Sequence, residues 1–399
     1  MFTAITNGNW NNSSTWDAGA VPTSTNDVLI PSPYTVTLSS GTNSCQNVNI
    51  TSGGTLTANT GTLNVDMTAL VTGTLGLGGA TVNIIGGTGT GLSILSGGAV
   101  NASSGTMLIG PAGGGNNTLN VAGALSITGG NITINGNFNV ASGASFTQSS
   151  GTLTIDGNSG TAATSVPQGT HLCNFSTNNL NCSGGTILIV DPPHSSYSNS
   201  TTNAVRTTAL ASTSAFSGTH TFQFGDGVST TAGNTNGFSI DTKRTGVVPI
   251  QNVIVNGGNT SGRWVSTSYS AGSFGTHLEG NLTINSGSEF RHTTACQLAI
   301  GGNIINNGTL STTQTFTLGG IGYVISNSQT ISGSGVFRNS TTTPTGAFTS
   351  LTVDNNSGLT LASSAVTFGV SGTLSILANK ITTGNNLSLI HISEPTRPY

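Results

Sequence analysis

Charged residues are scarce in this chain. Only 5% of the 399 positions are Asp, Glu, Lys or Arg, whereas a soluble globular domain carries about 25%. The eight basic residues are scattered, so they form no patch that could neutralise a phosphate backbone, and a nucleic-acid partner is not expected. The shortage of Lys and Glu also removes the side-chain pairs that stabilise exposed helices.

Long apolar runs are absent as well. The longest compact run is Ile187–Val190, far below the ~20 residues of a membrane-spanning helix. No basic segment followed by an apolar core is visible after Met1, so a secretory leader is not recognisable. We therefore expect no membrane span.

Cysteine is rare, with four residues that fit no zinc-binding spacing: Cys45, Cys173, Cys182 and Cys296. Nothing else in the sequence indicates a metal or a cofactor, and none is expected. The short separation of Cys173 and Cys182 leaves open both a local disulfide and two buried thiols.

What the chain does contain is glycine and small polar residues. Its 58 glycines, together with abundant Ser, Thr and Asn, are poor helix formers. Disorder is disfavoured because 34% of the residues are hydrophobic and the net charge is only -3. Glycine does not recur at every third position, which excludes collagen. An all-β protein remains.

An internal repeat defines the kind of all-β fold. The pattern reads SGGTLTANTGTLNV from Ser52, SGGAVNASSGTMLI from Ser96 and SGASFTQSSGTLTI from Ser142. Gly280 and Gly302 open two similar successive units, which indicates a period of about 22 residues, typical of solenoid repeats. Each unit holds short runs of alternating apolar residues, as in strands with one buried face. Three such strands with turns make one coil, so we predict a right-handed parallel β-helix. Tandem β-sandwiches, the alternative, need no fixed period.

The sequence divides into segments of different regularity. Two large aromatics, Trp10 and Trp16, precede the first coil and suit a cap over its open end, or a pair that stacks on a sugar. The middle of the chain is richer in proline and less regular, as expected for long loops or a small insertion. The predicted segments are a cap (1–40), regular coils (41–158), irregular coils (159–275), regular coils (276–386) and a tail (387–399).

Two stretches carry a resemblance to a known family. Gly8-Asn9-Trp10, Thr15-Trp16, Gly19, Val21-Pro22, Asp27-Val28 and Val36-Thr37-Leu38 resemble the start of many secreted surface proteins of Bacteroidota, and Phe348 to Leu389 looks like a repeat of the same proteins. The resemblance implies export by the type IX route, a location outside the cell or on its surface, and a role as an adhesin or structural component. The signal peptide and sorting domain typical of that family are not recognisable here.

The last residues differ abruptly in composition. Leu387 to Arg397 reads LSLIHISEPTR, which resembles the in-frame translation of a common sequencing adapter. We therefore expect residues 387–399 to be a non-native tail and the chain to be a truncated fragment. Self-association through an uncapped last coil follows as an expectation.

The densest ionisable cluster consists of His277, Glu279, Glu289, Arg291 and His292. Strand alternation is expected to turn the first four outward, into solvent. A constant period would place Ser311 one coil beyond Glu289, so no charged row is expected along a face. Scattered solvated charges are favoured over a catalytic pair. The candidate glycan contacts are Trp264, Tyr269, His277, Glu279, Glu289 and Arg291.

Three classes of function compete. The leading one is a non-enzymatic secreted or cell-surface rod, an adhesin or structural component whose partners are surface glycans or other surface proteins. The alternative is a carbohydrate-active β-helix, either a polysaccharide lyase or hydrolase or a glycan binder. The third is a solenoid that binds ice or another surface through outward threonine ladders. Thr55 with Thr57 and Thr152 with Thr154 suggest such ladders, but coils of unequal length are expected to break them.

Overall fold

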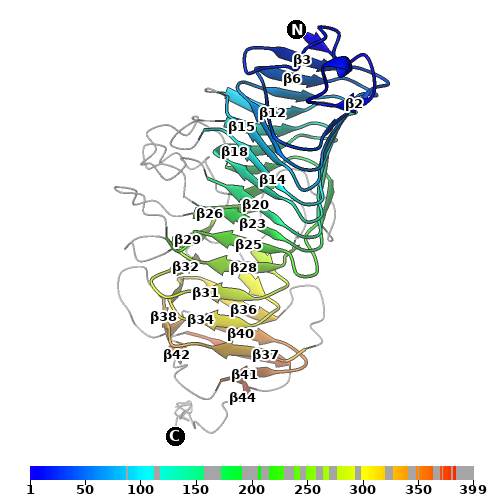
Figure 1. Cartoon of the computed structure of the whole chain (residues 1–399). Coiled ribbons are helices and arrows are strands. Elements are labelled where there is room, and N and C mark those ends of the chain that lie inside the picture. The colour runs from blue at the N-terminus through cyan, green and yellow to red at the C-terminus, as the bar shows by residue number, and fades with distance from the viewer. Residues whose placement is uncertain are drawn as a thin grey trace, which may run out of the picture.

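In a computed structural model, the chain forms the predicted parallel β-helix, a long stack of coils (Figure 1). Every pairing between the named strands is parallel and joins one coil to the next. The structure describes residues 1–86, 89–111, 117–156, 172–190, 205–207, 215–228, 238–242, 249–257, 264–268, 276–292, 298–319, 327–339, 347–348, 350–362, 369–370, 372–378 and 381–382. Tyr269, Cys296 and the expected tail at 387–399 lie outside these residues.

Three walls surround the core, and each regular coil contributes one strand to every wall. Wall 1 consists of β1 (Phe2–Thr3), β3 (Asp27–Ile30), β6 (Asn47–Ile50), β9 (Ala69–Val71), β12 (Gly89–Ile94), β15 (Asn117–Val121), β18 (Gly136–Val140), β21 (Cys173–Phe175), β24 (Val205–Thr207), β26 (Phe238–Thr242), β29 (Trp264–Ser268), β32 (Glu289–His292), β35 (Thr309–Thr312) and β38 (Val336–Arg338).

Wall 2 is built from two successive sheets. The first contains β2 (Gly8–Asn9), β4 (Thr35–Leu38), β7 (Thr55–Ala58), β10 (Thr74–Leu77), β13 (Ala99–Ala102), β16 (Ala124–Ile127), β19 (Ser145–Gln148) and β22 (Asn179–Cys182). The second contains β27 (Pro249–Ile250), β30 (Thr276–Leu278), β33 (Leu298–Ile300), β36 (Thr315–Gly319), β40 (Ser350–Asp354) and β43 (Leu374–Ala378).

Wall 3 runs along the rod as one sheet. It consists of β5 (Thr42–Cys45), β8 (Thr62–Val65), β11 (Thr81–Ile84), β14 (Thr106–Ile109), β17 (Asn131–Ile134), β20 (Thr152–Ile155), β23 (Thr186–Ile189), β25 (Thr221–Phe224), β28 (Asn252–Val255), β31 (Leu282–Ile284), β34 (Ile304–Asn306), β37 (Gln329–Ser332), β41 (Leu359–Leu361) and β44 (Ile381–Thr382). A separate pair is formed by β39 (Ala347–Phe348) and β42 (Gly369–Val370). With 14 strands in wall 3, the stack is roughly 65 Å long at the usual spacing between strands.

Alternation along each strand builds the core. In β7, Leu56 and Ala58 are buried while Thr55 and Thr57 are only partly covered, and most strands of the first coils repeat this pattern. The buried side chains of all coils form one continuous hydrophobic cluster. In mid-rod, aromatic rings meet in a column, mostly edge to face, with centroids 5.0 to 5.9 Å apart: Phe138, Phe146, Phe175, Phe216 and Phe222. Burial of one such side chain contributes about 1.5–3 kcal/mol.

Coil length varies widely while most strand pairs keep their register; shifts occur between β12 and β15 and between β40 and β43. Thr62 pairs with Thr81 in the next coil, and Thr186 pairs with Thr221, although the chain between the second pair is nearly twice as long. The additional residues lie between strands, so the strands themselves stay aligned. Glycine permits the tightest turns. At Gly105, for example, φ is 72°, and a Cβ would lie 2.4 Å from a carbonyl oxygen of the preceding coil.

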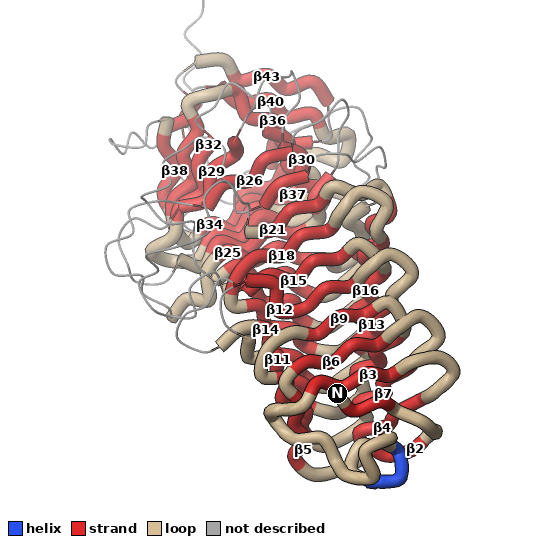
Figure 2. Tube along the Cα trace, turned by 90° about the horizontal axis from the view of Figure 1, so that it is seen from above, coloured by secondary structure: helices blue, strands red, loops and turns tan. Residues whose placement is uncertain are grey.

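The N-terminal end is closed by aromatic side chains. Trp10 and Trp16 are 0% and 1% exposed, and their rings meet edge to face with centroids 5.1 Å apart. The Trp16 indole N–H donates to the Trp10 carbonyl oxygen at 2.8 Å. The one-turn 3-10 helix η1 (Ser13–Thr15), which Trp16 follows directly, lies at this end of the stack and is blue in Figure 2. Because both rings are buried, neither offers a face for a sugar.

The irregular middle of the chain also contributes to the walls. The described strands β21, β24, β26 and β29 continue wall 1, and β23, β25 and β28 continue wall 3. Wall 2 changes sheet between β22 and β27, where Cys182 and Phe216 form an isolated parallel bridge. Among the described cysteines, Cys45, Cys173 and Cys182 are buried free thiols. No helix of the described part of the chain is both long and apolar enough to cross a membrane.

Candidate functional site

The structure separates the predicted site residues into two groups. Trp264 lies on β29 of wall 1, opposite Glu289 of β32 in the next coil, and Arg291 follows two residues later on the same strand. His277 and Glu279 instead lie on and just after β30 of wall 2. The cluster expected from sequence proximity is therefore divided between two walls.

His277 is not in solvent, contrary to the expectation from alternation. Its side chain is 1% exposed, and its register neighbour Ala299 on β33 is 0% exposed. Since Leu278 fills the core, this part of wall 2 is covered on both faces, and alternation no longer predicts exposure. Burial lowers the pKa of His277, so the imidazole is neutral at pH 7.

Glu279 is half-buried beside wall 2. Its Oε2 accepts a hydrogen bond of 2.6 Å from the amide of Gln251, and its backbone N–H donates to the Ile250 carbonyl. Its carboxylate is thus bound by a neutral amide in the preceding coil.

Glu289 is the centre of an ion cluster that crosses three coils. Arg291 Nη2 lies 2.7 Å from Glu289 Oε2, and Arg338 Nη2 lies 2.5 Å from Oε1. The Ser311 hydroxyl donates to Oε1 at 2.5 Å, and Arg338 Nε donates to that hydroxyl at 2.7 Å. The expectation of scattered, solvated charges is therefore wrong for this cluster. No charged row forms here, since Glu289 lies opposite Thr309 and Arg291 lies opposite Ser311 in the next coil.

The coils are of unequal length, and this hides the partners of Glu289 from a count with a constant period. Glu289 pairs with Thr309, and Arg291 pairs with Ser311, which in turn pairs with Arg338. The step from Glu289 to Thr309 is shorter than the expected period, and the step from Ser311 to Arg338 is longer, so a constant period misplaces the partners. Counting from the Gly that precedes each strand would have brought Arg291, Ser311 and Arg338 close to register. Sequence reasoning missed Arg338 altogether. It placed Ser311 one coil beyond Glu289 but assigned it no role in the site.

Both oxygens of Glu289 are engaged in holding the stack together. Burial alone would raise the pKa of this carboxyl, but hydrogen bonds from Arg291, Ser311 and Arg338 outweigh it and lower the pKa. The Arg291 guanidinium also lies 4.5 Å from the centroid of the Trp264 ring, a cation–π contact to the previous coil. We call Trp264, Glu289, Arg291, Ser311 and Arg338 the charge clamp, since they link four successive strands of wall 1.

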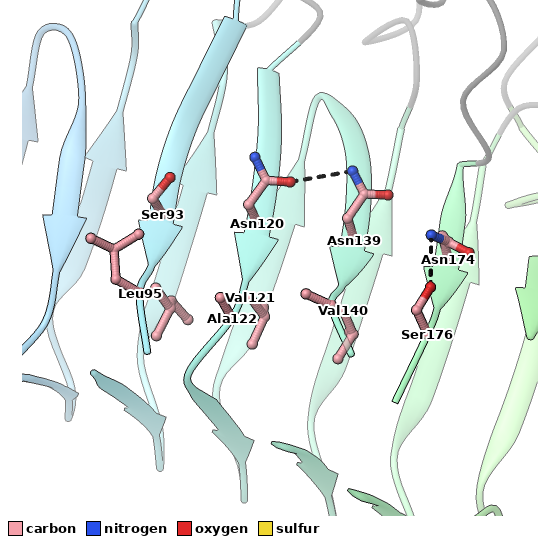
Figure 3. A pocket seen from close by; sticks show the side chains of 11 residues that line it. Ser93, Leu95, Asn120, Val121, Ala122, Asn139, Val140, Asn174 and Ser176 are labelled. Carbon is pink, nitrogen blue, oxygen red and sulfur yellow. Dashed lines mark hydrogen bonds between the residues drawn. The ribbon is translucent and has the colours of Figure 1, made fainter. Parts of the chain in front are cut away.

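A second feature, not foreseen from the sequence, is a groove on the outer face of wall 1 (Figure 3). It has a volume of about 330 Å³ and crosses β12, β15, β18 and β21. Its polar side is a register row of Ser93, Asn120, Asn139 and Asn174. The remaining lining residues are Ile94, Leu95, Val121, Ala122, Val140, Ala141 and Ser176.

Hydrogen bonds fix the amides of this row. Asn139 Nδ2 donates to Asn120 Oδ1 at 3.3 Å, and Asn174 Nδ2 donates to the Ser176 hydroxyl at 3.4 Å. Amides and hydroxyls beside short aliphatic side chains offer neutral hydrogen bonds and apolar contact. This combination suits an uncharged hydroxylated ligand. Across the described residues, no group of three or more His, Cys, Asp or Glu is placed to hold a metal ion.

Together, these features define a parallel β-helix poor in charge, with a charge clamp and a shallow, mostly apolar groove edged by amides. No protein-family model, curated protein or solved structure matches the chain.

Proposed function

We propose that this chain is a segment of a non-enzymatic rod, secreted or held at a cell surface, with a structural or adhesive role. The charge clamp supports the proposal most directly. Glu289, the acid of two ion pairs, has both carboxylate oxygens bound to Arg and Ser side chains. A carboxylate with a lowered pKa and no free oxygen is a poor general acid or base.

The composition fits the same role. Outer faces made mainly of hydroxyls and amides keep the rod hydrated, and eight Lys and Arg residues leave few sites for trypsin-like proteases. Export and a surface location rest on the resemblance to Bacteroidota surface proteins. The partners we propose are surface glycans or other surface proteins, with association of copies through the C-terminal coils.

One paired assay tests the absence of catalysis together with adhesion. Beads coated with the purified chain are scored for retention on immobilised neutral and acidic polysaccharides, while new reducing ends and unsaturated uronates are measured in solution. We expect retention on at least one surface without cleavage. Cleavage by the wild-type chain would overturn the proposal in favour of a polysaccharide lyase or hydrolase. Labelling of intact, unpermeabilised cells by an antibody to the chain tests the location.

Binding of a neutral glycan is a second candidate, favoured by the groove on wall 1. Asn139→Ala removes an amide from this groove, and Asn83→Ala is a matched control. Asn83 makes the same kind of bond, to Asn64 Oδ1 at 2.9 Å, on wall 3. A glycan bound in the groove loses affinity in the first variant and keeps it in the second. Equal affinity in both variants and the wild type excludes the groove.

A further inference from the structure

The outer face of wall 3 carries an unbroken row of short polar side chains. Eight successive strands, β5 to β25, each place their first residue outward in register with the next. Seven of these eight residues are threonine. We call this row the threonine ladder: Thr42, Thr62, Thr81, Thr106, Asn131, Thr152, Thr186 and Thr221. The expectation that unequal coils would break such a ladder is wrong, because the extra residues lie between strands.

Strand propensity alone does not account for the row. The outward strand positions of wall 2 in the same coils should favour β-forming residues equally. Its equivalent row begins with Thr35, Thr55 and Thr74, but then reads Ala99, Ala124, Ser145 and Asn179. Threonine therefore persists on one wall and is lost on another, although both fold in the same way.

The wall 3 face is uncharged and has no outward aromatic ring. None of the residues in these eight strands is Asp, Glu, Lys, Arg or His, and the phenylalanines of β25 are buried. A second outward row, two residues along each strand, holds Ser44, Asn64, Asn83, Leu108, Thr133, Thr154, Leu188 and Gln223. A face of this kind complements a neutral lattice of hydrogen-bond donors and acceptors rather than an ionic partner.

The geometry of the face is that of a two-dimensional grid. Neighbouring coils repeat every 4.7–4.9 Å or so, and residues two apart on a strand are separated by roughly 6.6 Å. The β-branched threonine has a stiff χ1, which holds its hydroxyl and methyl in place. The Thr106 hydroxyl donates to that of Thr81 at 3.2 Å, and Asn83 Nδ2 donates to Asn64 Oδ1 at 2.9 Å. Figure 1 shows β14, β20, β23 and β25 following one another along this face.

We propose that the outer face of wall 3 binds ice through the threonine ladder. Water oxygens in several planes of ice repeat at comparable distances in two perpendicular directions. Ordered hydroxyls can join such a lattice, while the methyl groups between them hold the adjoining water in place. Crystalline polysaccharides are the other flat neutral lattice, but their sugar rings are bound by stacked aromatic side chains, which this face lacks. The inference is independent of where the rod is located.

The test compares one substitution on two walls of the same coil. Thr81→Lys places a long charged side chain in the ladder, and Thr74→Lys does the same on wall 2. Both threonines are partly exposed and open their strands. Thermal hysteresis, inhibition of ice recrystallisation and partition into a growing ice front are measured for both variants and the wild type. We expect activity in the wild type, its loss in T81K and its retention in T74K.

Three outcomes would overturn the proposal. They are a wild-type chain without ice activity, equal loss in T81K and T74K, and binding to crystalline cellulose or chitin without binding to ice. Circular dichroism and thermal unfolding establish that both variants are folded. If T81K unfolds early, Thr62→Lys on the neighbouring coil gives the same comparison with Thr55→Lys as its control.

Discussion

The charge clamp allows a quantitative test of how this rod is held together. Glu289→Gln keeps the size of the side chain but removes the charge that faces two guanidinium groups. The side chains of Arg291 and Arg338 are 22% and 17% exposed, so the clamp lies between a surface pair and a buried one. Surface pairs contribute about 0–1 kcal/mol, and breaking a buried pair costs about 3–5 kcal/mol. We expect a loss of about 2–3 kcal/mol in the coils of β32, β35 and β38.

The measurement has to report on individual coils, because solenoids unfold coil by coil rather than in one step. Native-state hydrogen exchange of the β32, β35 and β38 amides should accelerate by roughly 30- to 150-fold in E289Q. Glu279→Gln is the matched control, because its carboxylate accepts from the neutral amide of Gln251, and its cost should stay below about 1 kcal/mol. The double variant E289Q with Arg338→Met should lose less stability than the sum of the losses in the two single variants, because both substitutions remove the same ion pair.

Acidification should reproduce the effect of E289Q. The folded pKa of Glu289 lies below its ordinary value of 4.5, so its contribution is complete above pH 4.5 and disappears as the pH falls through the folded pKa. Burial lowers the pKa of His220 to about 3, and that of His277 is lowered too, so both destabilise the fold below pH 6.5. The contributions of His220 and His277 are the same in the wild type and in E289Q, so they cancel when the two stabilities are subtracted. A difference that does not shrink as the pH falls, or strict additivity with R338M, would refute the clamp.

Two further predictions concern the coils themselves. Gly136→Ala should abolish native stacking of its coil, because a Cβ there would lie 1.6 Å from a carbonyl oxygen. Gly143→Ala meets no neighbouring atom and should cost only about 1–2 kcal/mol of backbone strain. Thermal unfolding measures both changes. Burial raises the thiol pKa of Cys45, Cys173 and Cys182, so peptide mapping should find them alkylated at pH 8 only after unfolding. Rapid alkylation of the folded chain would contradict their placement.

The architecture could be predicted from the sequence because two local patterns agree. Alternating apolar residues mark strands with one buried face, and Gly-containing turns recur at nearly constant intervals in the first coils. Register across coils could not be predicted from one fixed period, since turns absorb anything from a few residues to a long loop. This explains why Arg338, 49 residues from Glu289, was not recognised as its partner.

Exposure was the other quantity that the sequence did not provide. His277 occupies an outward position by alternation, yet both faces of its strand are covered. The groove on wall 1 could not be predicted either, because its lining comes from four successive coils whose register the sequence did not reveal. Patterns along one strand report which face is inward. They do not report what lies over the outward face.

A rod with so few charges has to bind through many weak neutral contacts. One hydrogen bond contributes about 0.5–1.5 kcal/mol net, too little for a lone hydroxyl to hold a surface. Eight ladder positions at a common spacing act together, because once one has engaged, the others are already placed. Removal of a single hydroxyl, as in Thr81→Val, should therefore weaken ice binding only slightly. A lysine at the same position keeps the whole face away from the ice lattice and should abolish binding. A large difference in ice-binding activity between Thr81→Val and Thr81→Lys would therefore show that the whole flat face binds, rather than one residue.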